Sequence, residues 1–500
     1  MRPSILAFTH AMSYPNAPDA FSDEPVWEDR AGPEEAAPEE VAPEEAPAAQ
    51  AAALEPPAPR NLEETGLSPS FLIELLLKIM HYAEMPTAEH VARTVALPAR
   101  LVDGLLVSLK EGQLCETISS PDLLPGTYRY RLTDMGRRRA EEALARCRYA
   151  GPAPVTLDQY EQMAERQSRR QWRPAKEGIR RAIASLILED DIAEFAERAL
   201  FSGRCVMVFG PTGNGKTHLL ASFIQNLDGM ILIPYSIYAY GQIIKVFDSF
   251  VHVRVHDEEA ENGSPNGEGD NGASLLSQVR AKDKRWVKIR RPGVIVAGEL
   301  TLEHLELGFD PVSRFYQAPP HLKAQGGILV VDDFGRQKVP PRELLNRWIM
   351  SLERGRDNLT LQTGESIDLP FHLVLLLSTN LAPGSLTDEA LLRRIPYKVY
   401  IPPPLPGLFK LILRGQCQNW GVECSEQALD DAVAFIQSMP DIRASGSLAR
   451  DLASIIVDNA VHDGCAPVLT TEALDLALQQ FTARQWAEAL GVGAGSSREG

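Results

Sequence analysis

A glycine-rich loop, Gly210-Pro211-Thr212-Gly213-Asn214-Gly215-Lys216-Thr217, follows the apolar stretch 205–209 and precedes the helix-compatible stretch 218–226. A strand, this loop and a helix form the setting that a P-loop requires, whereas an ordinary tight turn needs neither flank. The glycines let backbone N–H groups converge on phosphates, and the helix N-terminus adds partial positive charge. We expect all eight residues to cradle ATP, with Lys216 reaching the β- and γ-phosphates and the Thr217 hydroxyl binding Mg²⁺.

Two more apolar stretches end in polar residues. Residues 328–331 precede Asp332 and Asp333, and residues 373–377 precede Ser378, Thr379 and Asn380. Because α/β folds bind ligands at the carboxyl ends of strands, these side chains should face the phosphates. Asp332 is predicted to hold Mg²⁺ through water, Asp333 to polarise the attacking water and Asn380 to orient that water. Each motif is weak alone, since an Asn can simply turn the chain at a strand end.

Three arginines are candidates for contact with the γ-phosphate. Arg393 and Arg394 lie shortly after Asn380, and either could act as an arginine finger that stabilises transition-state charge in a neighbouring subunit; Arg394 is slightly preferred. Arg450 lies in the stretch 446–452 and could close over the phosphates. The alternative for each is a surface ion pair with a nearby acidic residue, such as Asp451 for Arg450.

The order of these motifs over about 205–455 resembles that of AAA+ ATPases. A predicted hairpin, 358–362 with 366–369, just before the Asn380 strand looks like the MoxR and sigma-factor-activator branch. The resemblance implies a P-loop NTPase core with a parallel sheet, a helical lid, ATP and Mg²⁺ as cofactors, and a hexameric ring of identical subunits. Most AAA+ proteins carry Glu at the position of Asp333, so the shorter carboxylate departs from the pattern.

A narrower resemblance covers about 62–485. The phrases Gly298-Glu299-Leu300-Thr301, Asp332-Asp333-Phe334-Gly335-Arg336-Gln337 and Leu392-Arg393-Arg394-Ile395-Pro396-Tyr397-Lys398 are similar to those of a bacterial AAA+ family. Its members are labelled predicted ATPases with chaperone activity, sometimes associated with Flp pilus assembly. This resemblance implies remodelling of a protein client. One departure is Leu448-Ala449 before Arg450, where the family is expected to carry His-Pro.

The N-terminal region divides into a tail and a helical segment. Residues 1–60 contain twelve acidic residues against three arginines, about half of the chain's net charge of −17, and their Ala/Pro/Glu composition predicts disorder. Residues 62–148 contain three predicted helices, two strands and a further helix, which resembles a winged helix-turn-helix. Arg129, Arg131 and the arginines at 137–139 could contact DNA phosphates. The predicted recognition helix 98–110 lacks Asn and Gln for reading adenine, so protein docking is the alternative.

The rest of the chain divides by composition. A linker is expected at 149–179, an ATPase core at 180–400 with a disordered insertion at about 256–275, a helical lid at 401–485 and a disordered tail at 486–500. Four aromatic residues between the two phosphate-site motifs either line a ring pore or belong to the core. These are Trp286, Phe309, Phe315 and Tyr316.

The overall composition argues against a membrane-spanning protein and against a disulfide-rich secreted protein. The chain is 44% hydrophobic and 23% charged, as in soluble globular proteins, and no apolar run reaches membrane-spanning length. Six cysteines occur without a C-x-x-C pair, which favours a reducing, cytoplasmic environment over a disulfide framework.

The sequence leaves three hypotheses for function. The leading one is a Mg-dependent ATPase that forms a ring and remodels a protein client. The second is a DNA-binding regulator that uses the winged helix and is switched by ATP. The third is a nucleotide-gated scaffold with little turnover, which the Asp at position 333 motivates.

Overall fold

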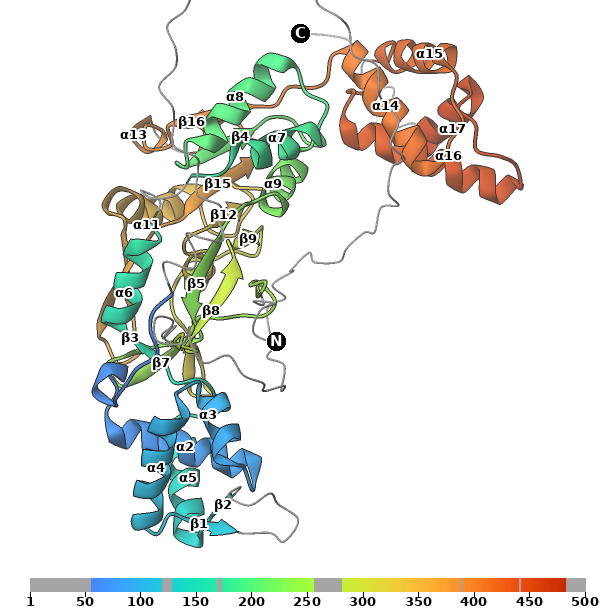
Figure 1. Ribbon diagram of the computed structural model, residues 1–500. Coiled ribbons are helices and arrows are strands. Elements are labelled where there is room, and N and C mark those ends of the chain that lie inside the picture. The colour runs from blue at the N-terminus through green and yellow to red at the C-terminus, as the bar shows by residue number, and fades with distance from the viewer. Residues whose placement is uncertain are drawn as a thin grey trace, which may run out of the picture.

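The computed structural model describes residues 55–118, 128–168, 173–255, 281–386, 389–439 and 442–482. The predicted disordered tails and insertion lie largely outside these residues. Figure 1 shows an elongated molecule with the N-terminal helices at one end, two β-rich layers in the middle and the C-terminal helices beyond the other end. Within the described ranges, no helix is long and apolar enough to cross a membrane.

The N-terminal helices pack around one apolar core with a small antiparallel sheet beside it. Its elements are η1 (Glu63–Thr65), α2 (Pro69–Ala83), α3 (Ala88–Val95), α4 (Ala99–Glu111), β1 (Cys115–Ile118), β2 (Arg129–Leu132) and α5 (Asp134–Arg146). The Ser68 and Thr87 hydroxyls cap α2 and α3 by accepting N–H bonds three residues on, which defines where each helix begins. These elements agree with the sequence expectation, and the winged-helix assignment itself stays a prediction.

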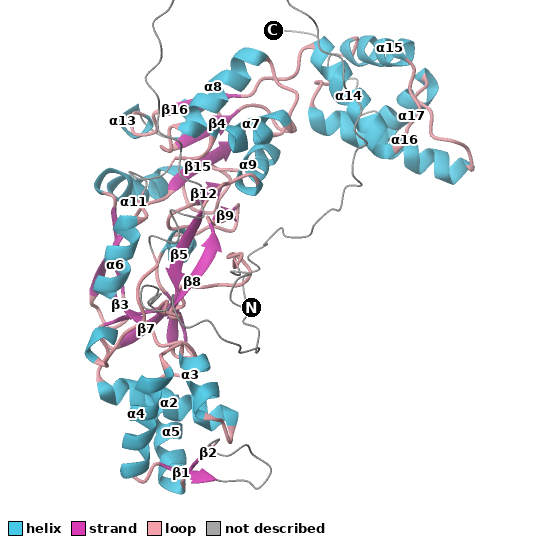
Figure 2. Ribbon diagram, in the orientation of Figure 1, coloured by secondary structure: helices cyan, strands magenta, loops and turns pink. Residues whose placement is uncertain are grey.

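A five-stranded parallel sheet forms the layer that carries the site motifs. Its strand order is β16 (Tyr397–Tyr400), β4 (Val206–Phe209), β15 (Val374–Thr379), β12 (Ile328–Val331), β9 (Gly293–Val296). All four residues of β12 are buried because helices cover both faces (Figure 2). Alternate residues pack on α7 (Lys176–Ala184), α8 (Asp190–Phe201) and α9 (Lys216–Gln225), or on α11 (Pro341–Arg354). The predicted α/β fold with a parallel sheet is confirmed.

The chain between α9 and β12, together with one strand from before α9, forms two further sheets. One is the antiparallel pair β5 (Met230–Pro234) and β8 (Trp286–Arg290). The other is mixed, in the order β10 (Gly308–Asp310), β11 (Phe315–Gln317), β7 (Gln242–Lys245), β6 (Ser236–Ala239), β3 (Val155–Thr156). Trp286 and Tyr316 are 9% and 1% exposed and belong to the core, whereas Phe309 and Phe315 are half-buried and pack against apolar clusters.

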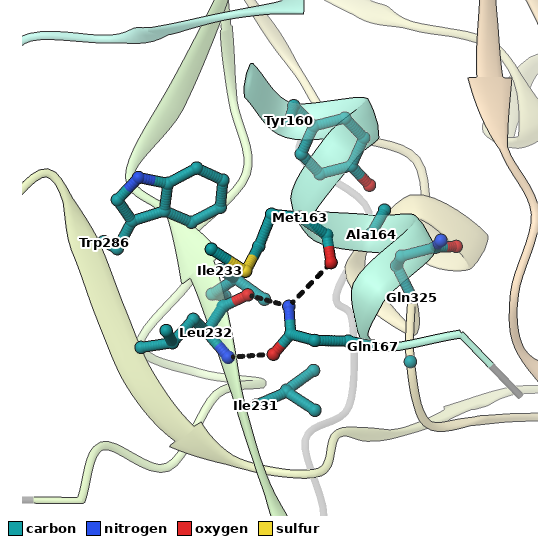
Figure 3. A pocket seen from close by; sticks show the side chains of 10 residues that line it. Tyr160, Met163, Ala164, Gln167, Ile231, Leu232, Ile233, Trp286 and Gln325 are labelled. Carbon is teal, nitrogen blue, oxygen red and sulfur yellow. Dashed lines mark hydrogen bonds between the residues drawn. The ribbon is translucent and has the colours of Figure 1, made fainter. Parts of the chain in front are cut away.

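Residues 149–168, which were expected to be part of a linker, are packed into this middle layer. They supply β3 and α6 (Leu157–Arg166), and the Gln167 side chain bonds to β5. The Leu232 N–H donates to Gln167 Oε1 at 2.7 Å, and Gln167 Nε2 donates to the Leu232 carbonyl at 2.9 Å (Figure 3). The Gln167 side-chain amide thereby bonds both the N–H and the carbonyl of Leu232, as a neighbouring strand would. Two-residue β3 is too short to recognise in the sequence, which is why the expectation was a linker.

Several short elements lie between the strands of these layers, and a helical C-terminal group follows β16. They are η3 (Glu303–Leu305), α10 (Pro320–Lys323), the hairpin β13 (Arg356–Thr360) and β14 (Ser366–Pro370), α12 (Pro383–Leu386) and α13 (Glu389–Leu392). The C-terminal group has its own apolar core. Its helices are α14 (Pro406–Trp420), α15 (Glu426–Gln437), α16 (Gly446–Asp463) and α17 (Thr471–Thr482).

Candidate nucleotide-binding site

The loop between β4 and α9 adopts a backbone that only glycine takes without strain. Gly213 and Gly215 each have φ of +82°, and Gly210 has φ of +144°. A Cβ on Gly210 would lie 2.2 Å from the carbonyl oxygen of Ile401, just beyond the neighbouring strand β16. The three glycines therefore allow the loop to curl tightly against the sheet edge.

Lys216 begins α9 and turns its ammonium back into the curl. Its Nζ donates to the carbonyl oxygens of Gly210 and Pro211 at 2.9 and 2.8 Å, and the residue is 8% exposed. Burial lowers the pKa of Lys216, while the nearby carboxylates Asp332 and Asp333 act in the opposite direction. The loop thus encloses a cation whose hydrogen-bond partners are neutral carbonyls.

The side chain of Asn214 indicates that the loop suits a polar ligand such as phosphate. Both side-chain amide atoms are buried and have no hydrogen-bond partner among the described residues. A buried unpaired amide costs about 1–3 kcal/mol, so a site of this kind needs a further polar partner. Phosphate oxygens would accept from the Asn214 amide and from Lys216 together. The residues of the loop fit ATP phosphates.

The second motif joins the loop through its first carboxylate. The Thr217 hydroxyl donates to Asp332 Oδ2 at 2.8 Å, which links α9 to the end of β12. The Asp333 N–H donates to Asp332 Oδ1 at 3.0 Å, and Asp333 itself has φ of +48°, a conformation uncommon for a residue other than glycine. Backbone of this kind concentrates at functional sites.

A hydroxyl and a carboxylate at this position fit Mg²⁺. The ion favours oxygen ligands and is usually held by one or two protein groups together with water and substrate phosphates. The described part of the chain contains no cluster of three or more His, Cys, Asp or Glu that could hold a metal ion. The Thr217 hydroxyl and the Asp332 carboxylate offer oxygen ligands of the required kind at this edge.

Asn380 follows β15, the strand between those that carry the loop and Asp332. Two hydrogen bonds hold the end of β15 against the residues after β12. The Phe334 N–H donates to the Ser378 carbonyl at 2.6 Å, and the Thr379 hydroxyl donates to the Phe334 carbonyl at 2.6 Å. The sheet order thereby brings Asn380 to the same edge as the loop and the two carboxylates.

Two residues at this edge were not singled out by sequence reasoning. Gln337 is 9% exposed, and its amide nitrogen donates to the carbonyls of Asp332 and Asp333 at 3.1 and 3.3 Å, which fixes the turn after β12. Arg336 contacts the Asn380 amide. Their position within four residues of Asp333 is the only signal in the sequence, because both contacts depend on how that turn folds.

The three candidate arginines each pair with a carboxylate in the single chain. Arg393 pairs with Glu389 at 2.9 Å, and Arg394 pairs with Glu353 of α11 at 2.5 Å. Arg450 donates to neighbouring Asp451 at 2.8 Å. The Arg393–Glu389 and Arg450–Asp451 pairs are those of the alternative interpretation, whereas Arg394 pairs with a residue 41 positions away that the sequence did not indicate.

The C-terminal helices reach the loop through the first turn of α16. The Ser447 N–H donates to the Gly213 carbonyl at 2.9 Å. A Cβ on Gly213 would lie 2.0 Å from Ser447 Oγ and 3.0 Å from Ser447 Cβ. The start of the helix that carries Arg450 therefore packs directly on the glycine-rich loop.

Known proteins resemble parts of this chain. The Thermotoga maritima RuvB Holliday junction branch migration motor is similar at 12% identity and TM-score 0.30, covering 61% of this chain and 69% of that chain. A RuvB mutant from the same organism gives 12% identity and TM-score 0.31, with 61% and 70% covered. No match was found among curated proteins. A family model described as a domain of unknown function, DUF8689, matches residues 406–480, the segment that forms α14 to α17.

Proposed function

We propose that this chain is an AAA+ type ATPase that binds Mg-ATP at the glycine-rich loop and hydrolyses it. The observation that carries the proposal is the 2.8 Å hydrogen bond between the Thr217 hydroxyl and Asp332 Oδ2. It joins two motifs that lie 115 positions apart into one group of oxygens beside the Lys216 ammonium. A phosphate site and a magnesium site at one sheet edge are what P-loop nucleotide hydrolysis requires.

The residues divide the work of hydrolysis between them. The loop N–H groups, Asn214 and Lys216 would bind the phosphate oxygens, and Thr217 and Asp332 would hold Mg²⁺. The metal ion, when bound, supplies positive charge against the β- and γ-phosphate oxygens. Asp333 would accept a proton from the attacking water, and Asn380 would orient that water in line with the γ-phosphate.

Phosphate release by the purified full-length chain tests hydrolysis. We expect Asp333→Asn to lower the rate by about 100- to 10,000-fold while ATP binding is retained, because the amide keeps the shape of the carboxylate but cannot accept the proton. Asp333→Glu restores the longer side chain that AAA+ proteins usually carry and should keep activity. A wild-type rate equal to that of Asp333→Asn would leave only the nucleotide-gated scaffold.

We further propose that the active subunits form a ring, with an arginine supplied from each neighbour. The Arg393 side chain is 75% exposed, against 41% for Arg394. An exposed i,i+4 ion pair is worth only about 0.3–0.5 kcal/mol, so Arg393 can leave Glu389 at little cost. Exposure therefore favours Arg393 over Arg394, the residue that the sequence favoured, as the finger.

Mixing two inactive variants tests the shared site. Lys216→Ala subunits would lack ATP binding but keep the arginine, and Arg393→Ala subunits would bind ATP but lack the finger. If sites are shared, the mixture should hydrolyse ATP faster than either variant alone. The same experiment with Arg394→Ala compares the two arginines, and a mixture with no gain for either would contradict an interfacial finger.

Remodelling of a protein client and the link to Flp pilus assembly rest on the family resemblance alone. Asp333→Asn should stay in the ATP-bound state and hold a client, so pull-down with this variant tests the role. Lys216→Ala, which should not bind ATP, is the matched control. Equal recovery of the same proteins by both variants would argue against an ATP-dependent client.

A further inference from the structure

Arg336 lies beside Asn380 at the sheet edge. In the amide orientation that satisfies both groups, Asn380 Oδ1 accepts from Arg336 Nε at 3.2 Å and from Nη2 at 2.6 Å. Hydrogen bonds from a charged donor are roughly twice as strong as those between neutral groups. The guanidinium is therefore the dominant partner of the amide oxygen.

This contact decides which end of the Asn380 side chain is free. An amide has one oxygen that accepts and one nitrogen that donates. With the oxygen directed at Arg336, the nitrogen is left to donate, and a γ-phosphate oxygen or the attacking water needs a donor here. The opposite amide orientation would place the two nitrogen-bearing groups against each other.

The turn that carries Arg336 is held rigidly against the end of β15. Gly335 has φ of +102°, and a Cβ on it would lie 2.6 Å from Leu386 Cδ2 and 2.9 Å from Leu381 Cδ1. The Arg336 N–H donates to the Asp333 carbonyl at 2.9 Å. Arg336 and Asp333 thus belong to one turn, and that turn is packed on residues that follow Asn380.

We propose that Arg336 is a positioning residue for hydrolysis. It holds the Asn380 amide with its oxygen toward the guanidinium and its nitrogen toward the γ-phosphate and the attacking water. This inference rests on the proposed ATPase function and extends it, because one residue joins the two that handle the water: the Arg336 side chain contacts Asn380, and the Arg336 N–H donates to the Asp333 carbonyl. Arg336 itself does not touch the nucleotide.

Steady-state ATP hydrolysis by full-length variants tests the proposal. Arg336→Ala should lower kcat by about 10- to 100-fold, the scale expected when a catalytic group is misplaced, with little change in KM. Arg336→Lys keeps the charge but loses the planar two-nitrogen contact, so its kcat should fall between wild type and Arg336→Ala. Lys338→Ala removes an exposed cation from the same loop and is the matched control, with wild-type kinetics expected.

A double-mutant cycle separates positioning from direct phosphate contact. If Arg336 acts through Asn380, the double variant Arg336→Ala/Asn380→Ala should be no slower than Asn380→Ala alone. Asn380→Asp keeps an oxygen for Arg336 but lacks the donor, and should be as slow as Asn380→Ala. A further fall in the double variant, or weaker ATP binding by Arg336→Ala, would mean that the guanidinium contacts phosphate itself and would overturn the inference.

Two failures are distinguishable. Wild-type kcat in a folded Arg336→Ala protein, with thermal unfolding unchanged, would reject the positioning role and leave the ATPase proposal intact. A wild-type protein that releases no phosphate would reject both.

Discussion

Basic side chains lie both at the edge of the parallel sheet and in the N-terminal helical group, but they differ in exposure and in their hydrogen-bond partners. At the sheet edge, Lys216 is 8% exposed and donates to two carbonyl oxygens. In the N-terminal group, Arg131 pairs with Glu116 at 2.6 Å, and its side chain is 48% exposed; Arg137 pairs with Asp134 at 2.5 Å. Lys216 is thus buried against neutral partners beside two carboxylates, whereas Arg131 and Arg137 are exposed and pair with carboxylates; Arg129 donates to the Met85 carbonyl at 3.1 Å, and buried Lys78 donates to the Cys147 carbonyl at 3.2 Å.

This difference in partners affects how readily each basic side chain can bind a phosphate oxygen. A buried ammonium with only carbonyl partners gains when phosphate oxygens replace them, because charge-assisted hydrogen bonds are stronger. An arginine that already pairs with a carboxylate must give up that pair before it contacts DNA phosphate. Of the arginines predicted to contact DNA, Arg131 and Arg137 therefore contribute less to a phosphate site than Arg129, which donates to the Met85 carbonyl.

The largest effect should come from removing the buried cation. We expect Lys216→Ala to weaken Mg-ATP binding by about 100- to 1000-fold, the scale for losing one preorganised charge donor. Isothermal titration calorimetry measures the affinity. Lys284→Ala removes an exposed lysine away from the loop and should bind as wild type does. Unchanged affinity in Lys216→Ala would remove the basis for the comparison.

A smaller effect should follow from the metal carboxylate. Asp332→Asn keeps a partner for the Thr217 hydroxyl but loses the charge that attracts Mg²⁺, so affinity for Mg-ATP should fall by about 10- to 100-fold. With EDTA in place of Mg²⁺, the variant and the wild type should bind ATP equally. An equal loss in both conditions would indicate damage to the loop rather than to a metal site.

A substitution at the contact between the glycine-rich loop and the C-terminal helices should lower the stability of the protein. Gly213→Ala places a Cβ against Ser447 at a backbone φ of +82°, and the left-handed conformation alone costs about 1–2 kcal/mol. Differential scanning calorimetry should show a lower Tm. Gly415→Ala lies within α14 with nothing within 4 Å of the new Cβ, and should be neutral or stabilising by up to about 1 kcal/mol. The comparison fails if both variants shift Tm alike.

The smallest effect is expected at the N-terminal arginines. Glu116→Gln removes the partner of Arg131, and because the pair is exposed we expect at most about 1 kcal/mol of stability to be lost in urea unfolding. Release of Arg131 should also raise affinity for duplex DNA if the winged-helix hypothesis holds. Titration of full-length protein at two salt concentrations measures this, and equal, salt-independent affinity in both proteins would favour protein docking.

Local patterns in the sequence predicted the parts of the site that one segment makes by itself. The glycine-rich loop, β12 with its two aspartates and β15 before Asn380 each combine an apolar run with polar residues at its end. The parallel sheet was implied by the resemblance to AAA+ ATPases that these motifs carry.

Contacts between distant segments were beyond the reach of the sequence. Arg336 meets Asn380, Ser447 meets Gly213, and Gln167 meets Leu232, 65 positions away, only because the sheets bring them together. None of these pairs has a periodicity or a spacing that marks it. The choice between Arg393 and Arg394 as the arginine finger posed a similar problem, because side-chain exposure, which favours Arg393, is a property of the folded chain.

The hydrogen bond from the Ser447 N–H to the Gly213 carbonyl links the glycine-rich loop directly to the first turn of α16. Lys216 now occupies the carbonyls of Gly210 and Pro211, and it must release them to meet a phosphate. Because Gly213 lies in the same loop, the first turn of α16 is in direct contact with the backbone that a phosphate would meet, and α16 in turn belongs to the apolar core of the C-terminal helices.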